Sequence, residues 1–231
     1  MNTIKKQEVD NRINSNIKAS FTLTYILLLT TGTITLVEAL RTKNPVVRHI
    51  FNLETVISII AGYFYSVFVS IIEKHEEKNI PLNWHEINKL RYIDWSITTP
   101  IMLLVLCVAL SQHSEVKLNF LIYIGIIILN FTMLLLGYLG EINKINKNLA
   151  MTTSFISFIV MFTIIYINFV QPKYSLFNYI LFSFFFVIWS IYGLIYKVRE
   201  DYRAIMYNIL DLFAKCFIGI GLWVYFADLF K

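Results

Sequence analysis

Seven long apolar stretches dominate this sequence, and their length constrains the fold more than any other feature. Each is almost entirely hydrophobic, and short polar loops separate them. A helix of about 20 residues crosses the hydrocarbon core of a bilayer, which is about 30 Å thick. The expected spans are Phe21 to Leu40, His49 to Ile72, Trp84 to Leu110, Leu118 to Leu139, Leu149 to Phe169, Leu176 to Tyr196 and Ala204 to Phe226. The sequence therefore predicts an all-α, seven-transmembrane helix bundle in a lipid bilayer.

The predicted domain organisation is simple. Residues 1–20 are expected to form a polar tail, which is a poor signal peptide because no small-residue cleavage site follows the first apolar stretch. Residues 21–231 are expected to form one transmembrane domain. Lysine and arginine occur in the tail, in the loop from Arg41 to Arg48 and in the loop from Lys197 to Arg203. The positive-inside rule therefore does not orient the bundle.

Two ionisable residues lie in the middle of the last apolar stretch. Asp211 and Lys215 are four residues apart, so they share one face of a helix. A charged residue at the centre of a bilayer costs about 3 kcal/mol on insertion scales, so a membrane span keeps one only where it has a function or a partner. The neutral amine of lysine can form a Schiff base with a carbonyl compound. The pair is therefore either a Schiff-base site or a structural ion pair.

A second polar group lies in the third apolar stretch. Arg91 and Asp94 are three residues apart and share a helix face, and Pro100 follows inside the same predicted helix. Asp94 and Asp211 can flank the nitrogen of Lys215, because a buried ammonium or protonated Schiff base needs counter-ions, and Arg91 would offset the excess negative charge. A charge cluster that only joins helices is the alternative interpretation.

The remaining patterns exclude several kinds of function. The sequence has no paired histidines at metal-ligand spacing, no Gly-rich phosphate loop, no Ser-His-Asp arrangement and no nucleic-acid motif. We therefore expect no enzyme, no metal site and no nucleic-acid partner. Cys107 and Cys216 lie in apolar spans and are expected to be packed thiols. Trp189, Tyr192 and Tyr196 form an aromatic stripe at helical spacing, which fits either core packing or a cofactor wall.

These residues resemble a known family. The run from Arg91 to Pro100 looks like the third helix of microbial (type I) rhodopsins, and the run from Asp211 to Lys215 looks like their seventh. The resemblance implies all-trans-retinal bound to Lys215 as a Schiff base, with Asp94 as primary proton acceptor and Asp211 as second counter-ion. It also implies an outside N-terminus and a tyrosine, Tyr65, that supports the counter-ions. The implied retinal pocket consists of Trp95, Thr98, Thr99, Met102, Met133, Gly137, Trp189, Tyr192 and Tyr196.

One position departs from the proton pumps of this family. They usually carry an acid eleven residues after the acid of helix three, and here that position is Val105. Glu54, in the second span, is then the candidate proton donor. An acid in helix two, together with Glu38, Arg41 and Trp223, resembles the group II rhodopsins of giant viruses. That resemblance implies a host-cell membrane and a homo-oligomer, with a pentamer as one form. We expect Glu38 and Arg41 to form either an ion pair at the membrane surface or a gate or subunit contact.

The expected function is light-driven outward proton transport, with retinal, protons and the lipid bilayer as partners. A light-gated cation channel and a sensory photoreceptor are the alternatives. The viral channels carry several acids along helix two, whereas only Glu54 lies inside that span here. A halide pump would replace Asp94 with a neutral residue. On the outer side, Arg203 stands where archaeal pumps carry a proton-release carboxylate, and the sequence does not choose between Glu200 and Asp201 for that role.

Overall fold

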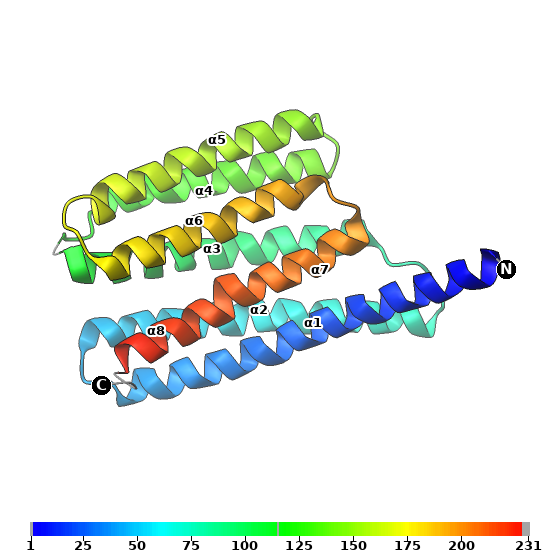
Figure 1. Cartoon of the computed structure of the whole chain (residues 1–231), viewed down its shortest axis with the longest axis horizontal. Coiled ribbons are helices and arrows are strands. Elements are labelled where there is room, and N and C mark those ends of the chain that lie inside the picture. The colour runs from blue at the N-terminus through cyan, green and yellow to red at the C-terminus, as the bar shows by residue number, and fades with distance from the viewer. Residues whose placement is uncertain (1, 115, 228–231) are drawn as a thin grey trace.

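In the part of the chain that the structure describes, seven helical rods lie side by side (Figure 1). The computed structural model describes residues 2–114 and 116–227, with side chains from residue 15 onward, residue 113 excepted. The rods are α1 (Asn2–Arg41), α2 (Pro45–Glu77), α3 (Trp84–Ser114), α4 (Phe120–Glu141), α5 (Lys147–Ile165) with η1 (Tyr166–Val170), α6 (Leu176–Leu194) with η2 (Ile195–Lys197), and α7 (Glu200–Asp211) with η3 (Leu212–Phe217) and α8 (Ile218–Phe226). Seven segments are long and apolar enough to cross a membrane, which confirms the predicted all-α, seven-span class.

Asparagines mark where several helices begin and end. Asn44, Asn119 and Asn146 each accept a hydrogen bond from a backbone N–H of the first turn that follows, at 3.0, 2.9 and 2.8 Å. Asn79 and Asn143 have positive φ angles of 50° and 55°, just after α2 and α4 end. Asparagine tolerates this left-handed conformation better than most residues, so both positions turn the chain back toward the bundle.

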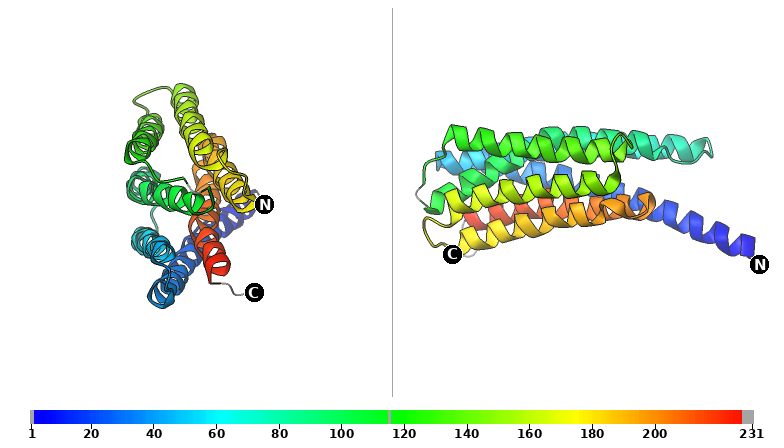
Figure 2. Two further views of the ribbon diagram at one scale, coloured as in Figure 1. Left: turned by 90° about the vertical axis from the view of Figure 1, so that its left-hand side faces the viewer. Right: turned by 90° about the horizontal axis from the view of Figure 1, so that it is seen from above.

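The helices divide into two groups on either side of α3 (Figures 1 and 2). α1, α2 and the α7–α8 rod lie together on one side, and α4, α5 and α6 lie on the other. The chain termini lie at opposite ends, as expected for seven spans. The first turns of α1 project beyond the bundle together with the end of α2 (Figure 2), and Lys18 Nζ contacts Glu76 Oε2 there at 2.7 Å. α1 continues without a break from Asn2, and its apolar span begins at Ser15.

Burial follows the pattern of a membrane protein. Large apolar side chains cover the outside, and Leu40 and Leu121 are 78% and 77% exposed. Charged side chains lie inside, where Arg91, Asp94 and Lys215 are at most 1% exposed. Lipid-facing positions must be apolar, whereas polar groups at this depth are tolerated only where they meet one another in the bundle interior.

The last rod is irregular at its centre. Between α7 and α8, residues Leu212–Phe217 form a wider π-helical turn, and Lys215 lies within it. Such turns occur mostly at functional positions of helices, because they change the direction in which one side chain points. α3 continues through Pro100, and the hydroxyl of Thr99, just before it, donates to the backbone oxygen of Trp95 at 2.6 Å.

Candidate functional site

The site is centred on the amine of Lys215. Its Nζ donates a hydrogen bond to Asp94 Oδ2, from α3, at 2.7 Å, and lies 3.6 Å from Asp211 Oδ2, one turn earlier on its own rod. All three side chains are almost completely buried. The structure thus brings together the two acids and the lysine that the sequence predicted as a group. An ion pair of this depth is stable only when its remaining polar atoms are also paired.

Asp211 has a complete set of partners. The hydroxyl of Tyr65 donates to Oδ2 at 2.7 Å, and the hydroxyl of Tyr192 donates to Oδ1 at 2.6 Å. Arg91 NH1 lies 3.6 Å from Oδ2. Donors of this kind stabilise the ionised carboxylate, so Asp211 has little remaining capacity to accept a proton.

Asp94 differs from Asp211 in this respect. Its Oδ1 is buried and has no hydrogen-bond partner among the described residues, and the only donor to its side chain in that part of the chain is Lys215. A buried carboxylate oxygen without a partner either holds a water molecule or is ready to take a proton. Of the two acids, Asp94 is therefore the one that has an unpartnered oxygen beside Lys215 among the described residues.

Arg91 lies beside Asp211 in the same buried cluster. NH2 donates to Asn208 Oδ1 at 2.8 Å, and NH1 donates to the hydroxyl of Tyr65 at 3.3 Å. The guanidinium carbon lies 5.4, 5.3 and 5.5 Å from the ring centroids of Phe21, Phe68 and Tyr207. Aromatic faces attract such a cation. Two cations and two anions therefore meet in one buried cluster, which is neutral overall.

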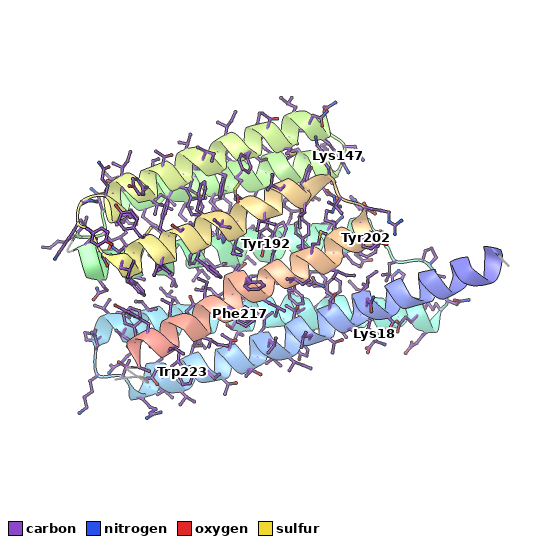
Figure 3. The ribbon with its side chains drawn as sticks, in the orientation of Figure 1. Lys18, Lys147, Tyr192, Tyr202, Phe217 and Trp223 are labelled. Carbon is purple, nitrogen blue, oxygen red and sulfur yellow. The ribbon has the colours of Figure 1, made fainter. Side chains whose placement is uncertain are left out.

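A cavity of about 120 Å³ extends from Lys215 toward α4, α5 and α6. Its walls are mostly aromatic and apolar, as in sites for small organic molecules. The lining residues include Tyr92, Trp95, Thr99, Met102, Met133, Leu134, Gly137, Met151, Ser154, Phe155, Phe158, Trp189, Tyr192, Gly193, Tyr196, Tyr207 and Ala214. A Cβ on Gly137 would lie 2.9 Å from the hydroxyl of Tyr92, so a larger residue there would require the Tyr92 side chain to shift. Figure 3 shows Tyr192 near the middle of the bundle, on α6.

Comparison with protein families matches residues 16–229 to the family described as bacteriorhodopsin-like protein. The chain belongs to this family. Among solved structures, viral rhodopsin OLPVRII is 44% identical, covers 93% of this chain and 99% of its own, and superposes with a TM-score of 0.85. Xanthorhodopsin, described as a light-driven ion pump with dual chromophore, is 18% identical over 91% of this chain and 92% of its own, with a TM-score of 0.76, and shares the fold. Comparison with curated proteins found no match.

Members of the bacteriorhodopsin-like family are integral, multi-pass membrane proteins that act as transporters or photoreceptors rather than enzymes. They bind retinal through a Schiff base to a lysine. The residues of this rhodopsin fit such a group, because the apolar cavity ends at one buried amine that two acids flank. When bound, retinal would supply the absorption of visible light, and the residues that line the cavity, Trp95 and Trp189 among them, would hold it.

The residues predicted for the retinal pocket line the cavity, with the exception of Thr98. Thr98 is buried, but its hydroxyl donates to the backbone oxygen of Asp94 at 2.9 Å. Tyr65, which the resemblance assigned to the support of the counter-ions, lies outside the cavity lining and donates to Asp211 Oδ2 at 2.7 Å and to Asn208 Oδ1 at 3.1 Å. Sequence reasoning missed Tyr207, although it lies four residues before Asp211 and so on the same helix face. It also missed the aromatic residues of α5, because apolar periodicity alone does not separate lipid-facing from cavity-facing positions.

Glu54 lies on the opposite side of Lys215 from Arg91. Its side chain is 2% exposed, and the described residues give it no hydrogen-bond or ion-pair partner. A Cβ built on Gly219, one turn after Lys215, would lie only 3.2 Å from Glu54 Oε2. Val105, the position without an acid, is fully buried among apolar residues.

The two ends of the rhodopsin bundle hold polar contacts that the sequence did not predict. Glu38 Oε2 accepts a hydrogen bond from Trp223 Nε1 at 3.3 Å, and the described residues show no ion pair between Glu38 and Arg41. The label of Trp223 in Figure 3 marks this end. At the other end, Arg203 NH2 contacts Glu141 Oε1 at 2.7 Å, with both side chains buried. Glu200 Oε1 also lies 3.8 Å from Arg203 NH2, whereas Asp201 pairs with Arg199. The proton-release role considered for Glu200 and Asp201 stays a prediction.

Proposed function

We propose that this protein is a light-driven outward proton transporter, with retinal attached to Lys215. The observation that carries the proposal is the asymmetry of the two acids. Asp94 lies 2.7 Å from Lys215 Nζ and has an oxygen without a partner in the described residues, whereas both oxygens of Asp211 accept tyrosine hydrogen bonds. A proton acceptor must lie within hydrogen-bond distance of the proton that it takes, and Asp94 meets this condition.

Each residue of the site has a distinct part in the proposed reaction. Retinal supplies the light absorption and the change of shape that alters how the protein holds the proton. Asp94 takes the proton from Lys215 Nζ, and Asp211 stays ionised. Arg91 NH1 lies 3.6 Å from Asp211 Oδ2, so its positive charge stabilises the ionised form of Asp211.

Glu54 is the proposed donor that returns a proton to Lys215 from the cytoplasmic side. Its support is burial, the lack of an ion-pair partner among the described residues, and a position one helical turn beyond Lys215 at Gly219. A carboxyl group in apolar surroundings is expected to keep its proton until a stronger base appears nearby. The nitrogen of Lys215 is that base after Asp94 has taken its proton.

A pH electrode in an unbuffered suspension of illuminated cells tests the proposal. Cells that contain the protein and retinal should acidify the medium, and a protonophore should abolish the signal. Asp94→Asn should remove the signal while visible absorption remains, and Lys215→Ala should remove the absorption as well. Glu73→Gln, an exposed change on α2, is the control. A photocurrent that reverses with voltage would instead indicate a channel, and a photocycle without current would indicate a sensor.

We also propose that the protein forms a homo-oligomer, with a pentamer as one form, in a host-cell membrane. This proposal rests on the similarity to group II viral rhodopsins. Native mass spectrometry from lipid nanodiscs should give a multiple of the 27.1 kDa chain. A monomer alone in several lipid compositions would contradict it.

A further inference from the structure

Two buried hydroxyl groups between α1 and α2 have no hydrogen-bond partner in the part of the chain that the structure describes. Most hydroxyls in these helices donate to a backbone oxygen one turn earlier, as Thr33 and Thr55 do at 2.9 and 2.8 Å. Thr31 and Ser58 are fully buried, yet neither hydroxyl makes any hydrogen bond to the described residues. A buried polar group without a partner costs free energy, so each such group needs an explanation.

Both hydroxyls belong to residues that lie beside Glu54. A Cβ on Gly219 would lie 2.9 Å from Thr31 Cγ2 and 3.2 Å from Glu54 Oε2, so α1, α2 and α8 meet at this glycine. Ser58 follows Glu54 by four residues and therefore lies on the same face of α2. Its Cβ lies 3.1 Å from the position that a Cβ on Gly32 would occupy.

The same group of residues leads toward Lys215. Gly219 follows Lys215 by four residues, which is roughly 5–6 Å along the helix axis. Between them, Cys216 is buried and packs in one apolar cluster with Leu28 of α1 and Ala61 of α2. Glu54 and Thr31 therefore lie where α1, α2 and the last rod meet, about one helical turn from Lys215.

The part of α3 that follows the retinal pocket has no comparable set of polar side chains among the described residues. Leu103, Val105 and Leu106 are fully buried and belong to the apolar core, and none of them can give or accept a proton. A proton that leaves Glu54 for Lys215 must therefore pass along α1 and α2 or wait for water to enter an apolar region, which is unfavourable.

We propose that the hydroxyls of Thr31 and Ser58 relay the proton from Glu54 to Lys215, together with water that enters during the photocycle, and that Gly219 leaves room for them. In this step the O–H bond of the Glu54 carboxyl group breaks, and an N–H bond forms at Lys215 Nζ. Each hydroxyl accepts one proton and donates another, so it ends unchanged. Glu54 becomes a carboxylate and later takes a proton from the cytoplasmic side. The inference rests on the proposed role of Glu54 as donor.

Time-resolved absorption of the retinal-bound protein tests the relay, because it separates the loss of the proton from Lys215 from its return. Thr31→Val removes a hydroxyl at nearly constant volume, and Ser58→Ala removes the other. We expect the double variant to return the proton at least about tenfold more slowly, with the first transfer to Asp94 unchanged. Thr31→Ser, which keeps the hydroxyl, should have the wild-type rate. Thr31→Ala replaces Thr31→Val if the latter does not bind retinal.

Matched controls exclude a general effect of the substitutions. Thr33→Val and Ser66→Ala remove hydroxyls from the same two helices that are already bonded to backbone oxygens, and both should keep the wild-type rate. Glu54→Gln separates the two proposals. If Glu54→Gln slows the return but the double variant does not, the relay is wrong and the donor stands. If Glu54→Gln leaves the return unchanged, the donor is wrong and the relay with it.

Discussion

The amine of Lys215 lies 2.7 Å from Asp94 Oδ2 and donates a hydrogen bond to it, although Asp211 is only one turn away on the same rod, at 3.6 Å. Tyr65 and Tyr192 hold Asp211 in place and donate to both of its oxygens. Asp94 has no such donors in the described part of the chain. The difference in hydrogen bonding gives two chemically identical groups different capacities to take a proton.

Asp94→Asn should abolish light-driven acidification, by at least about a hundredfold in initial rate, because an amide cannot accept the proton. The visible absorption band should also move to longer wavelength, since the loss of a negative charge at 2.7 Å spreads the positive charge of the chromophore away from Lys215 Nζ. Absorption spectra and pH-electrode traces of the same sample measure both effects. A variant that retained full transport would show that Asp94 is not the acceptor.

Glu54→Gln should slow the return of the proton to Lys215 and leave the first transfer from Lys215 to Asp94 unchanged. The reason is that Glu54 and Asp94 lie on opposite sides of Lys215. The slowed step should respond to the pH of the medium, since the proton must then come from water. Flash spectroscopy across a pH series gives the measurement. Glu76→Gln, on the same helix but exposed and bonded to Lys18, should not change the rate.

Gly219→Ala should both destabilise the protein and slow the return of the proton. Its Cβ would lie 2.9 Å from Thr31 Cγ2 and 3.2 Å from Glu54 Oε2, and overpacking of this kind costs about 1–3 kcal/mol. Gly221→Ala is the matched control, two residues away, because no atom lies within 4 Å of its Cβ position. The two variants should differ clearly in stability, measured by denaturant titration, and in the rate of proton return, measured by flash spectroscopy. Equal behaviour would mean that Gly219 leaves no functional space.

Glu141→Ala should reduce the free energy of unfolding by about 3–5 kcal/mol, because it leaves Arg203 buried without its carboxylate. Glu141 also accepts a hydrogen bond from Asn88 at 2.7 Å, so the change disconnects α3, α4 and α7 at one end of the bundle. Denaturant titration in micelles, followed by the visible absorption, measures the loss. Glu200→Ala is the comparison, since Glu200 lies 3.8 Å from Arg203 at a more exposed position, and its effect should be below about 1 kcal/mol.

The spans and the central charges were predictable from the sequence for one physical reason. Apolar stretches of this length have few stable alternatives to a transmembrane helix. Charges inside them are costly, so Asp94, Asp211 and Lys215 stand out against their surroundings, and helical spacing puts Asp211 and Lys215 on one face. These are local properties of the chain, which is why the sequence alone was sufficient to determine them.

Only the tertiary structure decided which side chains meet across helices. Arg203 pairs with Glu141, 62 positions away, rather than with its neighbour Asp201, and Glu38 bonds to Trp223 rather than to Arg41. Helical periodicity gives the face on which a residue lies, but the rotation and depth of each helix against its neighbours determine its partner. The free hydroxyls of Thr31 and Ser58 likewise became visible only when all surrounding partners were known, because an unsatisfied group is a property of the packed bundle and not of the local sequence.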